Sequence, residues 1–211
     1  MRRVLAVVAV VVVLVGAGVV LVRAGSRDGA PESSVVTATS SNPQAGADAE
    51  WEVVEAAIGA ATGSQRWLYL PDEAITEEIG GIATAGSAER IAAAVVEDVA
   101  AARSGLSASP GRVWWLVRPL AWELEQRSAT EARVRVWVVT VLSAVEVAAP
   151  QADWMTVTVD LERVKGVWLV DDLTTTEGPT PMGGPHDAPW DAGPFDRALE
   201  GFTRLDGEPL W

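Results

Sequence analysis

A run of 19 apolar residues near the start of the chain constrains its fold more than any other feature. Val4 to Val22 contains only Val, Leu, Ala and Gly. As an α-helix this run would be about 28 Å long, close to the thickness of the hydrocarbon core of a bilayer. It has no polar face, which a surface helix of a water-soluble domain needs. The sequence therefore predicts a transmembrane anchor, with residues 1–23 forming a cytoplasmic stub and the anchor itself.

The charges around the anchor do not decide its orientation by the positive-inside rule, because arginines flank it on both sides at Arg2, Arg3 and Arg23. The short N-terminal flank also carries the terminal amine, whereas the chain beyond the anchor is acidic overall. Long domains cross a membrane largely regardless of such charge. We expect a single-pass protein of the cell membrane with its N-terminus in the cytoplasm and its domain outside.

A cleaved signal peptide is the alternative interpretation of the same run. Val22-Arg23-Ala24 resembles a small-x-small cleavage site. However, secretory signal peptides have apolar regions of about 7–15 residues, which is shorter than this run. An arginine directly before the cleavage point is also unusual. We therefore favour the anchor and keep the signal peptide as the alternative.

Composition excludes several classes of function. The 211 residues carry a formal net charge of −13, so phosphate backbones would repel the chain and we expect no nucleic-acid partner. Cysteine is absent and His186 is the one histidine, which argues against disulfides, thiolate chemistry and histidine-based metal sites. The sequence also lacks the common motifs for nucleotide binding, zinc hydrolysis, serine hydrolysis and calcium binding. We expect no enzymatic activity, no cofactor and no resident metal.

Three helices are predicted after a flexible linker at 24–47, which is rich in Gly, Ser, Ala, Pro and Thr. Apolar residues recur at helical spacing in each predicted helix, as at Ile91, Val95 and Val99 in the third. Helix-capping and helix-stopping residues suggest the ends. The predicted boundaries are Asp48 to Gly63, Pro71 to Gly80 and Ser87 to Gly105.

The period then changes to two, which is typical of strands. Within 154–163, Met155, Val157, Val159 and Leu161 alternate with polar residues and define a buried face. Lys165-Gly166 forms a two-residue turn to the next strand. The predicted strands are 112–125, with Pro119 at a bulge or an edge, then 132–142, 154–163 and 167–170. Helices followed by an antiparallel meander predict an α+β domain over 48–178, with the helices on one sheet face.

The chain from 179 to 211 is predicted to be a Pro/Gly-rich tail with a short terminal helix. Phe195, Leu199 and Phe202 would share one side of that helix.

The second half of the chain, over about residues 110–205, resembles known proteins. Its final hairpin, Lys165 to Val170, and its four strands resemble the nuclear-transport-factor-two-like cone fold. The anchor, tether and single domain are similar to inner-membrane scaffold subunits of type IV secretion systems. A closer likeness, to actinobacterial membrane-anchored proteins of conjugation-type gene clusters, rests on Ala132 to Val139, on Trp154 to Val159, and on Gly178 to Pro181 with Gly201 to Thr203. The resemblance implies a non-enzymatic role in assembly at the membrane.

Acidic residues are the one candidate for chemistry. Asp171 and Asp172 would lie near Asp160 and Glu162 on the neighbouring strand, where converging carboxylates could act as a general base or hold a cation. The alternative is a solvated strand end in an acidic protein. We favour it, because no acid, nucleophile or glycine-rich loop accompanies the carboxylates.

Tryptophan is unusually abundant, with ten residues. Most are expected in the core, but Trp114 and Trp115 are adjacent, so a strand points them to opposite faces. On strand 132–142 the polar face should carry Arg133 and Arg135 and, by period two, an exposed Trp137. Tryptophan beside arginine is enriched at protein–protein hot spots. We therefore predict Trp137, Arg133 and Arg135 as a protein-interaction site.

These features together predict a membrane scaffold or adaptor protein. Its partners would be other membrane or envelope proteins, or a second copy of the chain, in a conjugation- or secretion-type machine. The alternative is a surface-tethered cone domain that binds a small molecule or acts as an enzyme, although we do not expect a small ligand.

Overall fold

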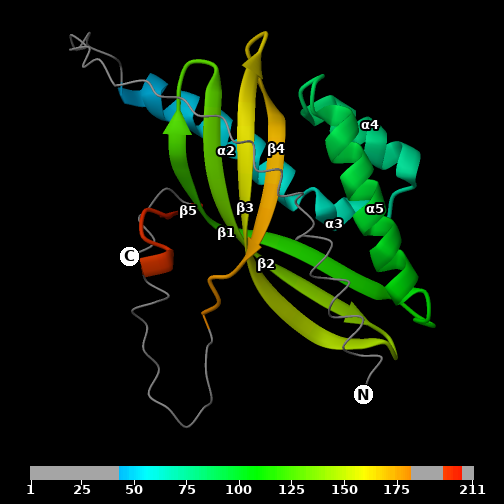
Figure 1. The fold of residues 1–211 in the computed structure, drawn as a ribbon. Coiled ribbons are helices and arrows are strands. Elements are labelled where there is room, and N and C mark those ends of the chain that lie inside the picture. Colours follow the sequence, from blue (N-terminus) through cyan, green and yellow to red (C-terminus); the bar gives the residue numbers. More distant parts are fainter. Residues whose placement is uncertain (1–42, 182–196, 206–211) are drawn as a thin grey trace, which may run out of the picture.

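The computed structural model describes residues 43–181 and 197–205 and has the predicted α+β architecture (Figure 1). Helices come first and an antiparallel meander follows. The elements are α2 (Pro43–Thr62), α3 (Ser64–Trp67), α4 (Asp72–Ile82), α5 (Ala88–Leu106), β1 (Val113–Arg127), β2 (Glu131–Ala144), β3 (Ala148–Val164), β4 (Val167–Glu177) and β5 (Thr203–Arg204).

The helix ends differ from the predicted ones. α2 begins at Pro43, ahead of the predicted cap at Asp48, and so includes the end of the predicted linker. α4 begins after Pro71 and continues beyond Gly80 to Ile82. A glycine inside a helix costs about 1 kcal/mol, which tertiary packing can override. Here Ile75 and Ile79 of α4 are fully buried, and their packing against the core holds the helix together.

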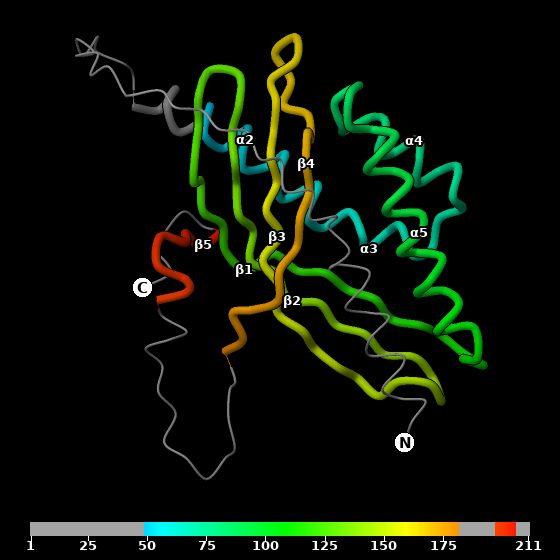
Figure 2. Tube along the Cα trace, viewed as in Figure 1, coloured from blue at the N-terminus to red at the C-terminus, as the bar shows by residue number. Residues whose placement is uncertain are grey.

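The sheet has the order β4-β3-β2-β1-β5, with every neighbouring pair antiparallel. β3 and β4 are longer than the sequence predicts. The long strands bend, so the sheet curls around the helices, and α2 crosses behind its upper part (Figures 1 and 2). Pro119 lies at a register shift between β1 and β2, which confirms the predicted bulge.

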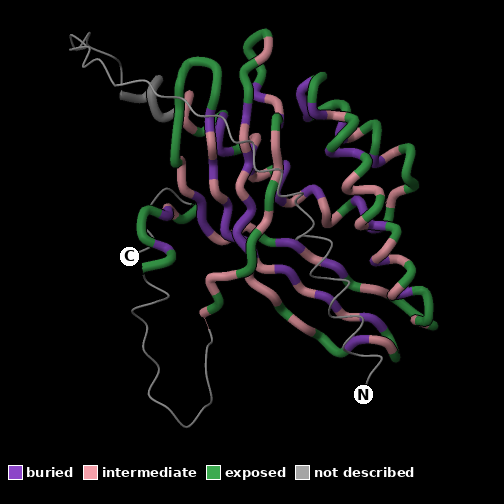
Figure 3. Tube along the Cα trace, viewed as in Figure 1, coloured by how far each residue is buried: buried purple, intermediate pink, exposed green. Residues whose placement is uncertain are grey.

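The main core fills the space between the helices and the inner face of the sheet (Figure 3). The inner face of β3 consists of Met155, Val157, Val159 and Leu161, each at most 3% exposed, as the alternation predicts. Burial of four such side chains stabilises the fold by about 1.5–3 kcal/mol each.

A second, smaller cluster lies on the opposite face of the sheet. Ala121 of β1 and Trp137 of β2 pack there with Leu199 and Phe202. The segment that carries the last two residues also adds β5 beside β1. The described part of the predicted tail therefore belongs to the folded domain.

The outer edge of β1 is sealed by side chains from the α3 region. The Tyr69 hydroxyl donates a hydrogen bond to the Val113 carbonyl (3.2 Å) and accepts one from the Trp115 amide (2.9 Å). Gln65 Oε1 accepts a bond from the Val117 amide (3.1 Å). These side chains satisfy the backbone groups that another strand would satisfy, so β1 is protected against edge-to-edge pairing.

The outer edge of β4 is covered over its first half. The Val170 carbonyl accepts bonds from the Thr84 amide (2.8 Å) and the Ser87 hydroxyl (2.9 Å), both in the loop before α5. The Asp171 carbonyl accepts a bond from Arg90 of α5 (2.9 Å). The loop and the start of α5 are thereby tied to the sheet.

The second half of the β4 edge is open. The Gly178 amide donates to the Trp154 carbonyl (2.7 Å), so Gly178 and Trp154 are a hydrogen-bonded pair at the end of the β3–β4 ladder. Hydrogen-bonded and non-hydrogen-bonded pairs alternate along an antiparallel ladder. Leu173, Thr175 and Glu177 therefore direct their backbone N–H and C=O groups away from β3. Within residues 43–181 and 197–205, nothing bonds to these groups.

The predicted anchor, Val4 to Val22, lies outside the described residues, as do His186 and Phe195. Among the helices that are described, none combines the length and the apolar character needed to cross a bilayer.

Candidate functional site

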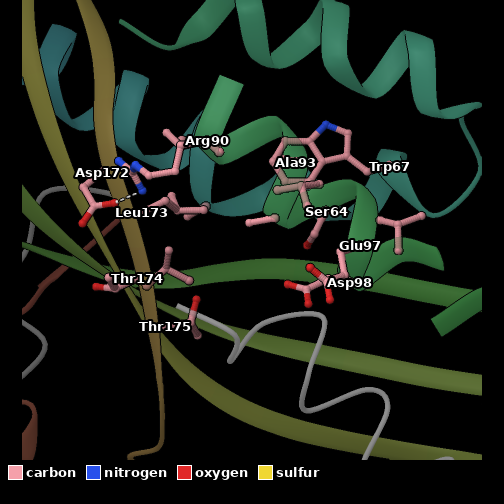
Figure 4. A pocket seen from close by; sticks show the side chains of 17 residues that line it. Ser64, Trp67, Arg90, Ala93, Glu97, Asp98, Asp172, Leu173, Thr174 and Thr175 are labelled. Carbon is pink, nitrogen blue, oxygen red and sulfur yellow. Dashed lines mark hydrogen bonds and ion pairs between the residues drawn. The ribbon is translucent and has the colours of Figure 1, made fainter. Parts of the chain in front are cut away.

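A cleft of about 350 Å³ lies between α5, the end of α2 and the open half of β4 (Figure 4). Such a volume lies at the small end of the range for ligand sites, about 300–1,000 Å³. Its wall on α5 includes Ala93 and Ala94, and its wall on β4 includes Leu173 and Thr175. Because alanine side chains are short, this face of α5 leaves space beside the sheet instead of filling it.

One end of the cleft is closed by an ion pair. Arg90 on α5 contacts the carboxylate of Asp172 on β4 at 2.9 Å (Figure 4). The same guanidinium bonds the Asp171 carbonyl, and the Asp171 carboxylate accepts a bond from the Thr84 hydroxyl (3.1 Å). Both acidic residues of the predicted candidate pair therefore hold α5 and its preceding loop against the sheet.

The remaining charges of the cleft are two carboxylates, Glu97 and Asp98 on α5. Burial, together with the smaller effect of the neighbouring Glu97 charge, raises the pKa of Asp98 from its usual 3.8 to about 6. Because Arg90 offsets Asp172, the cleft has an excess of negative charge. Asp98 can accept hydrogen bonds or pair with a cation, and a cation would replace the solvation that burial removes.

The structure brings three of the four acidic residues that the sequence suggested, Asp160, Glu162 and Asp171, around one pocket of about 400 Å³. Asp160 and Asp172 are register partners on β3 and β4, as predicted. Asp160, however, accepts two bonds from the guanidinium of Arg133, at 2.6 and 3.0 Å. In the described ranges no group of acidic or histidine side chains is arranged to hold a metal ion.

The predicted interaction site needs a correction at Trp137. Its side chain lies on the sheet face opposite the helices, as the period of two implies, but it is only 7% exposed. Leu199 and Phe202 cover it, and its indole N–H donates to the Pro179 carbonyl at 3.0 Å. The prediction of an exposed Trp137 was therefore wrong, because a segment far along the chain folds over that face.

The two predicted arginines lie on the same face and are part-buried in ion pairs. Arg135 contacts Glu123 at 2.8 Å and lies 4.9 Å from the centre of the Phe202 ring. Arg133 pairs with Asp160. These contacts join β1, β2, β3 and the C-terminal segment, so both arginines stabilise the covered face.

The prediction for the adjacent tryptophans is confirmed. Trp115 is buried in the main core at 1% exposure, whereas Trp114 is 48% exposed on the other face. Arg112 lies 5.1 Å from the centre of the Trp114 ring.

Sequence reasoning missed the cleft and Asp98. The predicted stripe on α5 was Ile91, Val95 and Val99, with Glu97 on the opposite side. Asp98 follows Val95 at a spacing of three, which places it beside that stripe. The position of Asp98 at the margin of the apolar stripe, close to the alanines at 92–94, is the sequence feature that could have indicated a part-buried acid beside an open space.

Comparisons with known proteins add little to this picture. No protein-family model and no curated protein matches the chain. Among solved structures, the chain is similar to the crystal structure of the intermembrane space region of the chloroplast protein ARC6, with 13% sequence identity and a TM-score of 0.35. The match covers 67% of this chain and 100% of that chain. A likeness at this level carries no argument about function.

Proposed function

We propose that this chain is a single-pass membrane adaptor that binds other proteins through its α+β domain and catalyses no reaction. The observation that carries the proposal is the apolar cleft beside an open sheet edge. Exposed backbone groups next to an apolar groove are a common basis for protein recognition. The predicted interaction residues Arg133 and Arg135, by contrast, are engaged in ion pairs within the domain.

The partners in this proposal are other membrane or envelope proteins, including a second copy of the chain. The apolar run Val4 to Val22 supports the membrane location. The resemblance to the nuclear-transport-factor-two-like cone and to scaffold subunits of secretion systems is part of the same proposal. A curled antiparallel sheet with helices on one face is compatible with that cone.

Site-directed photo-crosslinking of the full-length chain in its membrane tests the adaptor function. A photo-reactive residue at Ala93, which is exposed in the cleft, should capture a defined partner. The matched control is the same residue at Lys165, on the exposed hairpin between β3 and β4. Equal capture from both positions, or capture from neither, contradicts the proposal.

The proposed topology places the domain outside the cytoplasm. Because the chain has no cysteine, a single cysteine at the exposed position Ser107 reports its location. A membrane-impermeant thiol reagent should label this cysteine in intact cells. Labelling that requires permeabilised cells would reverse the orientation.

A small-molecule-binding domain is the second candidate, and part-buried Asp98 in an apolar cleft favours it. An apolar amine would match such a site. Under this function a compound from a library should raise the melting temperature of the chain, since ligands of the native state raise apparent stability. The same compound should lose its effect on an Asp98→Asn variant.

A further inference from the structure

We infer that the partner binds as an extended segment that adds a strand to the open half of β4 and directs a basic side chain toward Asp98. This inference rests on the proposed adaptor function. The occupant is a polypeptide segment of another protein with a lysine or arginine near small apolar residues.

The first argument is the difference between the two edges of the sheet. On β1, Tyr69 and Gln65 satisfy the outward backbone groups. On β4, the corresponding groups of Leu173 and Thr175 have no partner within the described ranges. An open edge with a Thr-Thr-Thr sequence has high β-propensity and is a template for another strand.

The second argument is the position of the cleft. Leu173 and Thr175 line it from β4, so it begins where the open edge does (Figure 4). Residues directly opposite each other on paired strands place their side chains on the same face. The residues of an added strand opposite Leu173 and Thr175 would therefore direct their side chains to the helix side of the sheet, into the cleft. These two residues are two positions apart in the added strand.

The third argument is charge. The Arg90–Asp172 ion pair neutralises one end of the cleft, and Glu97 and Asp98 lie toward the other end (Figure 4). The apolar wall of Ala93 and Ala94 lies between them along α5. A cationic side chain at the acidic end and a small apolar one beside the alanines would match this pattern. The expected recognition sequence is therefore an apolar residue and a Lys or Arg separated by one residue.

A display library of random linear peptides, selected on the full-length chain in detergent, tests the inference. Selected peptides should contain the apolar-x-basic pattern in either direction. N-methylation of their backbone amides one at a time should weaken binding about tenfold at alternate positions and have little effect between them, because only alternate amides face β4. This readout needs no change to the protein.

Variants of the chain give a second readout. Thr175→Pro removes an outward N–H but no bond to β3, and proline is tolerated at such edge positions. It should weaken binding of the selected peptide about tenfold. Thr175→Val keeps the N–H and reports what the side chain alone contributes. Asp98→Asn should weaken the basic peptide several-fold and reduce the salt dependence of its binding.

Several outcomes would overturn strand addition. These are failure to select any peptide, tolerance of N-methylation at every position, and equal binding to wild type and Thr175→Pro. Binding of an apolar amine in the cleft with no peptide binding would also overturn it. If crosslinking at Ala93 captures the same partner from wild type and from Thr175→Pro, the adaptor function stands and strand addition fails. If neither chain captures a partner and no peptide binds, both fail.

Discussion

Replacing Asp98 with asparagine should stabilise the folded chain at neutral pH and leave its stability in acid almost unchanged. The carboxyl is part-buried in the cleft, and its pKa is about 6 in the folded protein against an ordinary value of 3.8. The charged groups that share the cleft are Glu97 beside it and the Arg90–Asp172 ion pair at the far end. Among the described residues that line the cleft, Arg90 is the cation, and it does not offset the effect of burial on this pKa.

The sign follows from proton linkage. A raised pKa means that the folded chain keeps this proton at a pH where the unfolded chain has lost it. The free energy of unfolding therefore falls as pH rises through the window from about 4 to about 6, and it stays level above that window. A difference of about two pKa units corresponds to about 3 kcal/mol at most, since each unit is about 1.4 kcal/mol. Because Asp98 keeps part of its surface in water, we reduce this to about 1 kcal/mol.

Urea unfolding followed by tryptophan fluorescence measures the effect. At about pH 7.5 the Asp98→Asn chain should be about 1 kcal/mol more stable than wild type, and most of this gain should disappear by about pH 4. Glu97→Gln is the matched control, because it removes the same charge from an exposed side chain and should change stability by no more than about 0.5 kcal/mol. An equal gain at both pH values, or no gain at neutral pH, would refute the account of Asp98. A destabilising acid in a cleft is the pattern expected where function opposes stability.

Three further substitutions test the packing and the sheet edges. Trp137→Ala should lower the free energy of unfolding by about 3–5 kcal/mol, because the side chain is buried. A loss below about 1 kcal/mol would instead indicate that Trp137 is exposed, as the sequence predicted. Tyr69→Phe should cost about 1 kcal/mol and speed hydrogen exchange of the Trp115 amide, and unchanged exchange would show that the hydroxyl does not seal β1. Asp172→Asn should cost at most about 1 kcal/mol, since its ion pair with Arg90 is solvent-exposed, and the cost should shrink in about 1 M salt; a cost that salt does not change would contradict this.

Local sequence patterns predicted the elements of the fold well. The alternation in β3 identified its buried face, since side chains on a strand point to opposite sides with a period of two. Pro119 correctly marked a bulge, because proline cannot donate a ladder bond. The ends of elements were less accurate. α4 continues past Gly80 because burial of Ile79 stabilises the helix, and this stabilisation depends on residues distant in the sequence.

The candidate site was much less accessible to sequence reasoning. A period of two assigned Trp137 to the face opposite the helices, but it could not reveal that Leu199 and Phe202 cover that face. Likewise, Asp171 and Asp172 were identified as notable residues, yet their partners Thr84 and Arg90 come from segments more than 80 positions earlier in the chain.

The sequence by itself determined the apolar run at the N-terminus, the succession of helices followed by an antiparallel meander, and the buried face of β3, because these depend on residues close together in the chain. The tertiary structure alone decided which edge of the sheet stays open and where Asp98 meets the cleft. Tyr69 reaches β1 and Arg90 reaches β4 only after the chain has curled the sheet around its helices. Burial, which sets both the exposure of Trp137 and the pKa of Asp98, is a property of that assembled surface and of no local segment.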